Sequence, residues 1–151
     1  MARFSGTLTM DSGSILDATI SSATRIDADK MQHVYKPGTG FALAIGGTPA
    51  AREEIVFVAD QSGTIRSFHA LCNATGSAAS VTFDLKKNGT TCLSSVITIT
   101  NAQTSGQTYD GTLSVTTFAA GDIFSIALAV SSSTGMTGPY AWAAIEESQA
   151  P

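Results

Sequence analysis

Serine and histidine are the residues of this chain that could supply nucleophilic chemistry, because a serine hydroxyl becomes reactive when a histidine takes its proton. The sequence has 18 serines but only two histidines, His33 and His69. With so many serines, a Ser close to a His is expected by chance alone. No Gly-x-Ser-x-Gly turn, phosphate-binding loop or His-Glu-x-x-His pattern is present. We interpret His69, inside an expected strand, as a hydrogen-bonded packing residue, and we predict no catalytic residue and no enzyme.

The acidic residues do not form the converging pair that hydrolysis of a glycosidic bond requires. Glu53 and Glu54 are neighbours at the start of an expected strand, so their side chains should point to opposite faces. Glu146 and Glu147 stand at the end of another expected strand. We interpret both pairs as solvated strand ends.

The sequence also lacks metal-binding patterns. Cys72, Cys92 and the two histidines are not at the spacing of a structural zinc site. The loops that contain aspartate lack the density of oxygen ligands that Ca²⁺ requires. We therefore predict no metal and no cofactor. Cys72 and Cys92 fit two buried free thiols, and a disulfide between them remains an alternative if adjacent strands bring them together.

Charge and hydropathy argue against two classes of partner. The net charge is −4, and the eight basic residues are scattered along the chain. Because nucleic-acid binding depends on clustered cations, we expect no nucleic-acid partner. No apolar run reaches the roughly 18 to 20 residues that span a bilayer, and the first residues lack the pattern of a signal peptide. We expect a soluble protein that is made in a cytoplasm and does not bind a membrane.

Strand signals recur about every ten residues from residue 33 onward, separated by clusters of Gly, Asn and Asp. Eight such signals predict an all-β sandwich or barrel over residues 33–147. A chain of 151 residues suits one domain of this kind. The expected strands are 41–45, 54–59, 64–72, 80–87, 90–100, 112–118, 123–131 and 140–146. Loops are expected between them, including 74–78 and 131–139.

Alternation along the strands indicates which faces are buried. Val81, Phe83 and Leu85 should share the inner face, whereas Asp84 should lie outside, where it could pair with Lys86. In 123–130, bulky apolar residues alternate with Ser and Ala, so we expect this strand to be covered on both sides. Its face of small side chains could meet another subunit.

The dipeptide Asn88-Gly89 joins two such alternating runs. Both residues tolerate the positive φ angles that a type I′ turn requires, so the sequence predicts a tight hairpin here.

Residues 1–32 differ from the rest, because their short apolar pieces follow no long period. We interpret them as an extended N-terminal arm, and 148–151 as a C-terminal tail. The arm is either a disordered terminus or a segment that is ordered only against a neighbouring subunit. Its candidate interface residues are Leu8, Met10, Ile15, Leu16 and Ile20.

Tyr140 and Trp142 share one face of the last expected strand. They are the best candidates for a binding or interface patch among the few Tyr and Trp residues of the chain. Packing in the core is the alternative for both.

Four segments carry a resemblance to a known group of proteins. The runs "SVTFDLKKNGTTCLSSVITIT" and "AAGDIFSIALAVSSSTGMTGPYAWAAIEE", with "DADKMQHVY" and "GTIRSFHA" before them, resemble small jelly-roll virion proteins of tailed bacteriophages. The similarity covers roughly residues 25–147. These motifs are structural, so they bear on fold more than on role. The fold that the resemblance implies is a jelly-roll-like antiparallel β-sandwich. The order of the last strands is also similar to the trimeric jelly rolls of the tumour-necrosis-factor type.

The resemblance implies a capsid decoration (cement) protein. Such a protein would sit on the outside of a phage capsid as a homotrimer and clamp adjacent copies of the major capsid protein. It would be made in the host bacterial cytoplasm and end on the virion surface. No catalytic residue comes with the resemblance. A tail or head fibre module that binds a receptor through the aromatic residues near 131–142 is the second hypothesis, and a hydrolase is the third.

Overall fold

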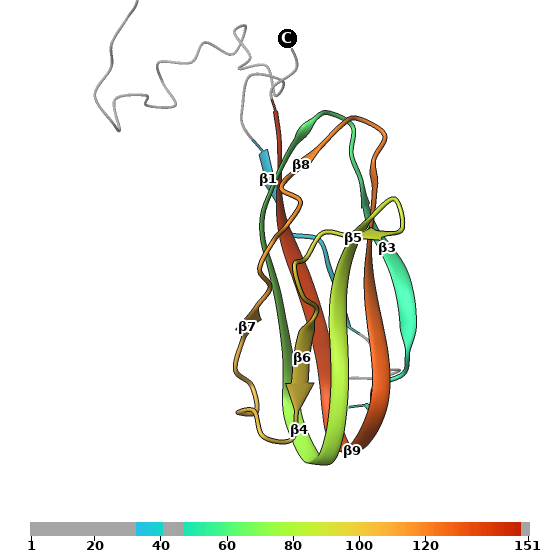
Figure 1. The fold of residues 1–151 in the computed structure, drawn as a ribbon, viewed down its shortest axis with the longest axis vertical. Helices are drawn as coiled ribbons and strands as arrows, with labels where there is room; N and C mark the ends of the chain where they lie inside the picture. The colour runs from blue at the N-terminus through green and yellow to red at the C-terminus, as the bar shows by residue number, and fades with distance from the viewer. Residues whose placement is uncertain (1–32, 41–46, 149–151) are drawn as a thin grey trace, which may run out of the picture. The chain divides into compact units, whose positions relative to one another are not determined.

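The computed structural model describes residues 33–40 and 47–148, and every regular element in these ranges is a β-strand (Figure 1). The chain divides into two units, Met1–Met31 and Gln32–Pro151, and the described residues all belong to the second. The predicted all-β class is confirmed. The predicted arm, the expected strand 41–45 and most of the tail lie outside the described residues. The strands are β1 (His33–Tyr35), β2 (Gly38–Gly40), β3 (Arg52–Val58), β4 (Gly63–Lys87), β5 (Thr90–Thr91), β6 (Ile97–Thr100), β7 (Tyr109–Asp110), β8 (Thr117–Phe118) and β9 (Ile123–Glu147).

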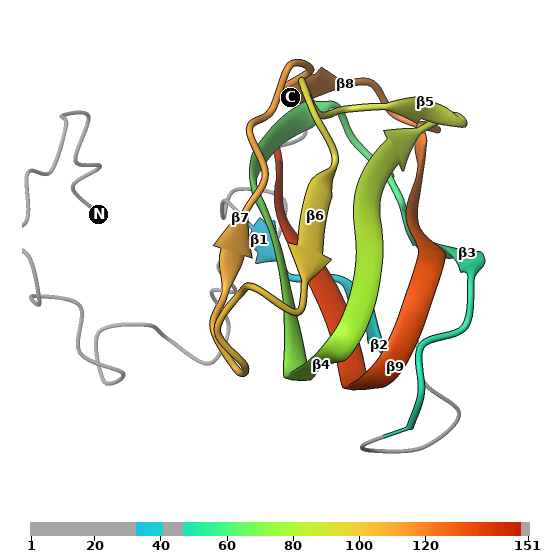
Figure 2. The same cartoon turned by 60° about the horizontal axis from the view of Figure 1, so that its bottom comes forward.

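Strands β4 and β9, each 25 residues long, organise the fold. They pair antiparallel along their whole length, from Gly63 opposite Glu147 to Lys87 opposite Phe124. Halfway along, the two strands bend together and turn back, as the green and orange-red ribbons show in Figure 1 and Figure 2. Each long strand therefore contributes to two layers.

The bend corrects the prediction of loops at 74–78 and 131–139, because both segments belong to the long strands. Gly76 and Gly135 lie at the bend with φ angles of 74° and 72°. The register also shifts between Thr75 and Ala78. Glycine tolerates this backbone geometry without a steric penalty, so the ribbon turns at this interruption and the ladder resumes at Ala78.

The two layers have a defined strand order. In the first layer, β1 and β2 lie beside the second half of β9 (136–147), followed by the first half of β4 (63–75) and then by β7 and β8. In the second layer, β3 lies beside the first half of β9 (123–134), followed by the second half of β4 (78–87) and then by β6 and β5. Every pairing is antiparallel.

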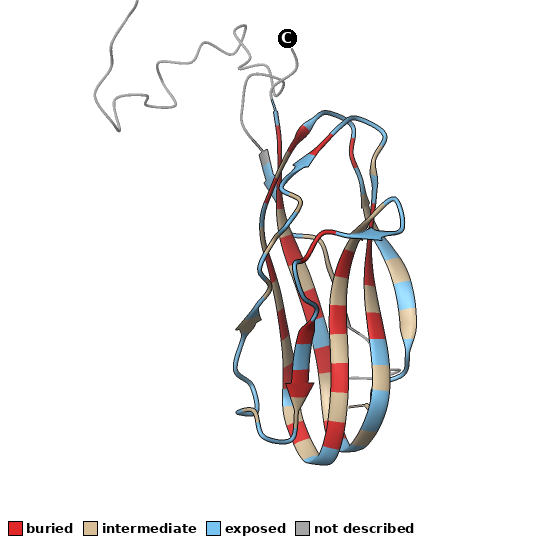
Figure 3. Cartoon of the chain, in the orientation of Figure 1, coloured by how far each residue is buried: buried red, intermediate tan, exposed pale blue. Residues whose placement is uncertain are grey.

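The inward side chains of both layers form one core, visible in Figure 3 as alternating buried and less buried bands along β4. Val81, Phe83 and Leu85 are fully buried, as predicted. Phe124 of the second layer packs edge to face on Phe118 of the first, with ring centroids 5.2 Å apart. Full burial of one such side chain stabilises the fold by about 1.5–3 kcal/mol.

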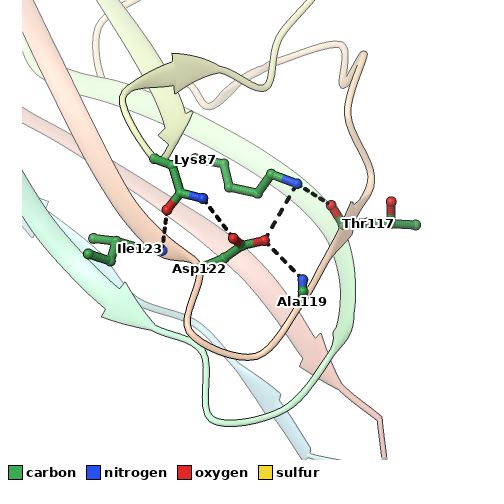
Figure 4. A network of polar contacts seen from close by, with 6 residues as sticks. Lys87, Thr117, Ala119, Asp122 and Ile123 are labelled. Carbon is green, nitrogen blue, oxygen red and sulfur yellow. Dashed lines mark hydrogen bonds and ion pairs between the residues drawn. The ribbon is translucent and has the colours of Figure 1, made fainter.

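The predicted Asn88-Gly89 hairpin is present between β4 and β5, with φ angles of 51° and 80° at the two residues. Figure 4 shows the polar network that anchors it. Asp122 accepts hydrogen bonds from the Asn88 Nδ2 (2.7 Å) and the Ala119 backbone N (2.9 Å). Lys87 Nζ donates to the Thr117 carbonyl at 2.9 Å and lies 3.6 Å from the Asp122 carboxylate. The network joins the turn after β4 to the turn before β9.

Candidate functional site

The outer face of the first layer gathers the candidate aromatic residues with three polar ones. Because side chains alternate along a strand, the burial of Phe68, Ala141 and Ala143 directs their neighbours outward. The register places His69 opposite both Trp142 of β9 and Asp110 of β7. We call this set the His69 face; it consists of Ser67, His69, Asp110, Tyr140 and Trp142.

Three rings lie side by side on the His69 face. The imidazole of His69 stacks on the Trp142 indole, with centroids 5.1 Å apart and planes 27° apart. Tyr140 lies 5.8 Å from Trp142 and is 41% exposed. The tyrosine hydroxyl lies over Gly38 of β2, where an added Cβ would come within 2.6 Å of it. Tyr140 and Trp142 therefore belong to the surface, and the alternative of core packing is wrong.

A chain of hydrogen bonds crosses the same face. His69 Nδ1 lies 2.7 Å from Asp110 Oδ1, and His69 Nε2 lies 2.7 Å from Ser67 Oγ. An ionised carboxylate can only accept, so Nδ1 carries the proton and Nε2 of the neutral ring accepts from the serine hydroxyl. His69 is hydrogen-bonded, as predicted, but its partners form a Ser–His–Asp arrangement that the sequence did not single out.

Arg66 and Glu146 continue this face toward one end of β4. The ladder is irregular between Ile65 and Ser67, which places Arg66 in a bulge. Arg66 donates from Nε to Glu146 Oε2 (2.5 Å) and from Nη2 to Oε1 (2.7 Å). These hydrogen bonds raise the pKa of the Arg66 guanidinium above its ordinary value. Glu146 therefore holds the Arg66 guanidinium in place, one residue before Ser67 in the chain.

The interpretation of Glu146 and Glu147 as solvated strand ends is wrong, because both are buried. Arg66 covers Glu146, and Glu147 accepts from the backbone N of Asp60 (2.7 Å) and of Gln61 (3.1 Å). Charged partners and backbone donors thus replace water at the end of β9.

The side chains of Glu53 and Glu54 point away from each other, as expected for neighbours in a strand. Glu53 binds Lys86 Nζ (2.7 Å) and the Ser125 hydroxyl (2.5 Å), and these bonds hold its pKa below the ordinary range. Glu54 instead contacts Arg52 and Thr39, so the two carboxylates diverge. A glycosidase pair is not formed here.

The expected Asp84–Lys86 contact is replaced by two others. Lys86 binds Glu53, whereas Asp84 accepts from the Thr91 hydroxyl at 2.5 Å. Each residue has a partner on a neighbouring strand, and the register that brings such partners together is not defined by local sequence.

Both cysteines are free and buried, which confirms the prediction of two thiols and excludes the disulfide alternative. Cys72 Sγ lies 3.6 Å from Met136 Sδ. Burial raises the pKa of each thiol to about 11. Neither side chain suits nucleophilic chemistry.

A second surface feature lies on the outer face of the other layer. Ile55 is 67% exposed, Val58 is 52% exposed and Ile123 is 41% exposed. Val58 and Ile123 are ladder partners. Ile55 pairs with Ser125, which follows Ile123 by two residues on β9. We call Ile55, Val58 and Ile123 the β3 patch. The predicted arm residues Leu8, Met10, Ile15, Leu16 and Ile20 lie outside the described residues.

Within residues 33–40 and 47–148, no group of three or more His, Cys, Asp or Glu side chains is placed to hold a metal ion. The same ranges contain no helix of the length and hydropathy needed to cross a bilayer. No protein-family model matches the chain, and no curated protein matches its sequence.

Proposed function

We propose that this chain is a structural virion protein that binds the outside of a phage capsid as a trimer and stabilises contacts between major capsid subunits. The observation that carries the proposal is the β3 patch, because apolar side chains as exposed as Ile55 and Val58 gather at one sheet edge. Grouped exposed apolar residues are typical of surfaces that bind another protein. The resemblance of the sequence to phage decoration proteins supports the same role.

The backbone of β3 adds to this argument. In the described part of the chain, β3 pairs on one side only, with β9. An edge strand with exposed apolar residues invites pairing with a further strand unless a partner covers it. Strand addition supplies backbone hydrogen bonds as well as apolar contact. We propose that residues 1–32 of a neighbouring copy contribute to this kind of assembly.

The strand order of the two layers also fits the proposal. We infer a jelly-roll connectivity, in which a long paired ribbon is folded across two sheets. Stable protein interfaces begin at about 1,200 Å² of total buried surface. A decoration protein reaches a large total effect by repeating such a contact around the shell, and no chemical step is needed.

Occupancy on purified empty capsids tests the proposal. Ile55→Lys would place a charge in the β3 patch and should reduce binding, whereas Gln107→Lys, at an exposed position between β6 and β7, should not. Deletion of residues 1–32 should also reduce occupancy. Sedimentation of the free protein should give the mass of three chains. Full occupancy by Ile55→Lys and by the deleted protein would overturn the proposal.

The second candidate is a tail or head fibre module that binds a receptor, which the His69 face favours. Tyr140 and Trp142 present adjacent rings beside hydroxyl and carboxylate groups, an arrangement that suits a sugar ring. Binding of the full chain to a glycan array, with loss of binding in Trp142→Ala, would support this role. Capsid binding without any glycan signal would exclude it.

A further inference from the structure

We propose that Ser67, His69 and Asp110 form a nucleophilic site that accepts the acyl group of a small carboxylic ester. The inference goes beyond the proposed virion role and does not depend on it. It stands on the Ser67–His69 and His69–Asp110 contacts, both 2.7 Å. This is the order of contacts in which a base activates a hydroxyl and a carboxylate orients the base.

Each side chain has a defined task. The Asp110 carboxylate holds the proton on His69 Nδ1 and so keeps Nε2 free to act as a base. Ser67 Oγ already lies within hydrogen-bond distance of Nε2, the reach that general-base catalysis needs. Asp110 acts through His69 and is therefore a positioning residue.

The site is open to a ligand from the outer face. Only a quarter of the His69 side chain is exposed, but 79% of the Asp110 side chain is, and Ser67 is half-buried. Trp142 covers one face of the imidazole, and Tyr140 extends the apolar surface beyond it. An ester whose alcohol part is an aromatic ring could lie against these side chains with its carbonyl at Ser67.

The reaction balances with water as the only co-reactant. The Ser67 Oγ forms a bond to the acyl carbon while its proton moves to His69 Nε2. The bond from the acyl carbon to the alcohol oxygen breaks, and the proton passes from Nε2 to that oxygen. Water then attacks the acyl-serine, releases the carboxylic acid and restores the serine hydroxyl.

The sheet limits the reactivity of this site. The N–H groups that pair β4 with β9 and β7 point sideways within the sheet, so these donors are not aimed above Ser67 at a developing oxyanion. One missing donor of this kind costs a factor of about 10²–10³ in rate. Arg66 is the nearest cation along the strand, and Glu146 occupies two of its N–H groups. We therefore expect reaction with activated aryl esters and not with simple alkyl esters.

The test uses the full chain with 4-nitrophenyl acetate and, separately, a fluorophosphonate probe followed by peptide mass spectrometry. The probe should label Ser67. Ser67→Ala should lose the label, and His69→Gln should lower the hydrolysis rate by a factor of about 10²–10⁴. Trp142→Ala should raise KM more than it lowers kcat.

Ser94 provides the matched control, because its exposed hydroxyl donates to the backbone carbonyl of Thr112 at 3.2 Å and not to a histidine. Ser94→Ala should leave rate and labelling unchanged. Thermal unfolding of each variant checks that it is folded. If the hydrogen bonds serve only to link β4 to β7, Ser67 will label no faster than Ser94, and that result overturns the proposal. Equal hydrolysis by the wild-type chain and Ser67→Ala also overturns it.

Discussion

Asn88 and Asp122 connect the two turns at one end of the sandwich. The Asn88 Nδ2 donates to Asp122 Oδ1 at 2.7 Å, and the Asn88 Oδ1 accepts from the backbone N of Ile123 at 2.9 Å. The adjoining residues Lys87 and Phe124 are ladder partners at the end of β4 and the start of β9. One asparagine thus ties the hairpin turn to the start of β9, next to the last ladder pair of the two long strands.

Two replacements of Asn88 should separate the contribution of its side-chain hydrogen bonds from that of its positive φ angle. Asn88→Gly removes the side-chain bonds but tolerates the φ angle of 51°, and we expect it to lower the free energy of unfolding by about 1–2 kcal/mol. Asn88→Ala adds the penalty of a left-handed backbone, a further amount of about 1 kcal/mol. Urea unfolding of both variants measures the difference. Equal stability of the two variants would contradict this account of the turn.

Acid should weaken the fold through Asp122. Hydrogen bonds from the Ala119 backbone and from Asn88 lower the pKa of Asp122 below its ordinary 3.8. A lowered folded-state pKa means that the stabilisation is fully present above 3.8 and is lost as the pH falls through the folded-state pKa. Unfolding free energies of wild type and Asp122→Asn should therefore converge as the pH falls below this value.

Lys87→Ala is the control for that measurement. Its charge contributes less to the pKa of Asp122 than the two hydrogen bonds do. The variant should keep most of the acid dependence. If Lys87→Ala removes the dependence and Asp122→Asn does not, the assignment to the carboxylate is wrong.

The thiols of Cys72 and Cys92 should resist alkylation in the native protein. Burial raises the pKa of each to about 11, against an ordinary value of 9.0. At about pH 8, roughly one thiol in a thousand is then a thiolate, and the thiolate is the reactive form. Iodoacetamide should modify both cysteines in concentrated urea and neither in buffer, as read by intact mass. Rapid native labelling would show that one of them is accessible.

The bend of the long strands should depend on Gly76. An added Cβ at this position would lie 2.3 Å from the Thr134 carbonyl oxygen, in a residue with φ of 74°. Gly121 has a similar φ of 86°, but no atom lies within 4 Å of its added Cβ. We expect Gly121→Ala to cost about 1–2 kcal/mol for the backbone alone. Gly76→Ala should cost clearly more, because the clash adds to the same strain.

Thermal unfolding of the two variants, side by side, measures this contrast. A Gly76→Ala protein as stable as Gly121→Ala would mean that the bend relaxes freely. Core substitution gives the scale for comparison, since Phe83→Ala at a fully buried position should cost about 3–5 kcal/mol.

The parts of the fold that were predictable are those with a local signal. The alternation of Val81, Phe83 and Leu85 and the Asn88-Gly89 turn depend on neighbours in sequence, and both were found. The continuity of β4 through 74–78 was missed, because the apolar alternation stops there. Pairing with residues 134–137 of β9 holds both sides of the register shift in the sheet through backbone contacts, regardless of side chain.

The contrast between local signals and distant contacts also explains which residues of the His69 face were predictable. Tyr140 and Trp142 are two residues apart, so the period of a strand predicted their shared face. Ser67 and His69 have the same spacing, but Asp110 joins them only through the register of β4 with β7. A Ser-x-His pair inside an expected strand was the available signal, and its meaning depended on a distant partner.

The pairing of β4 with β9 has a consequence for the order in which the chain folds. Lys87 and Phe124 are the ladder partners nearest in sequence, whereas Gly63 and Glu147 are the farthest apart. Closing the shorter loop first loses less chain entropy, and each later pair extends the ribbon by a small step. We therefore expect the ribbon to zip from the Asn88 end toward the bend and to reach Glu147 last. Dominance of such distant contacts also implies slow folding for a chain of this length.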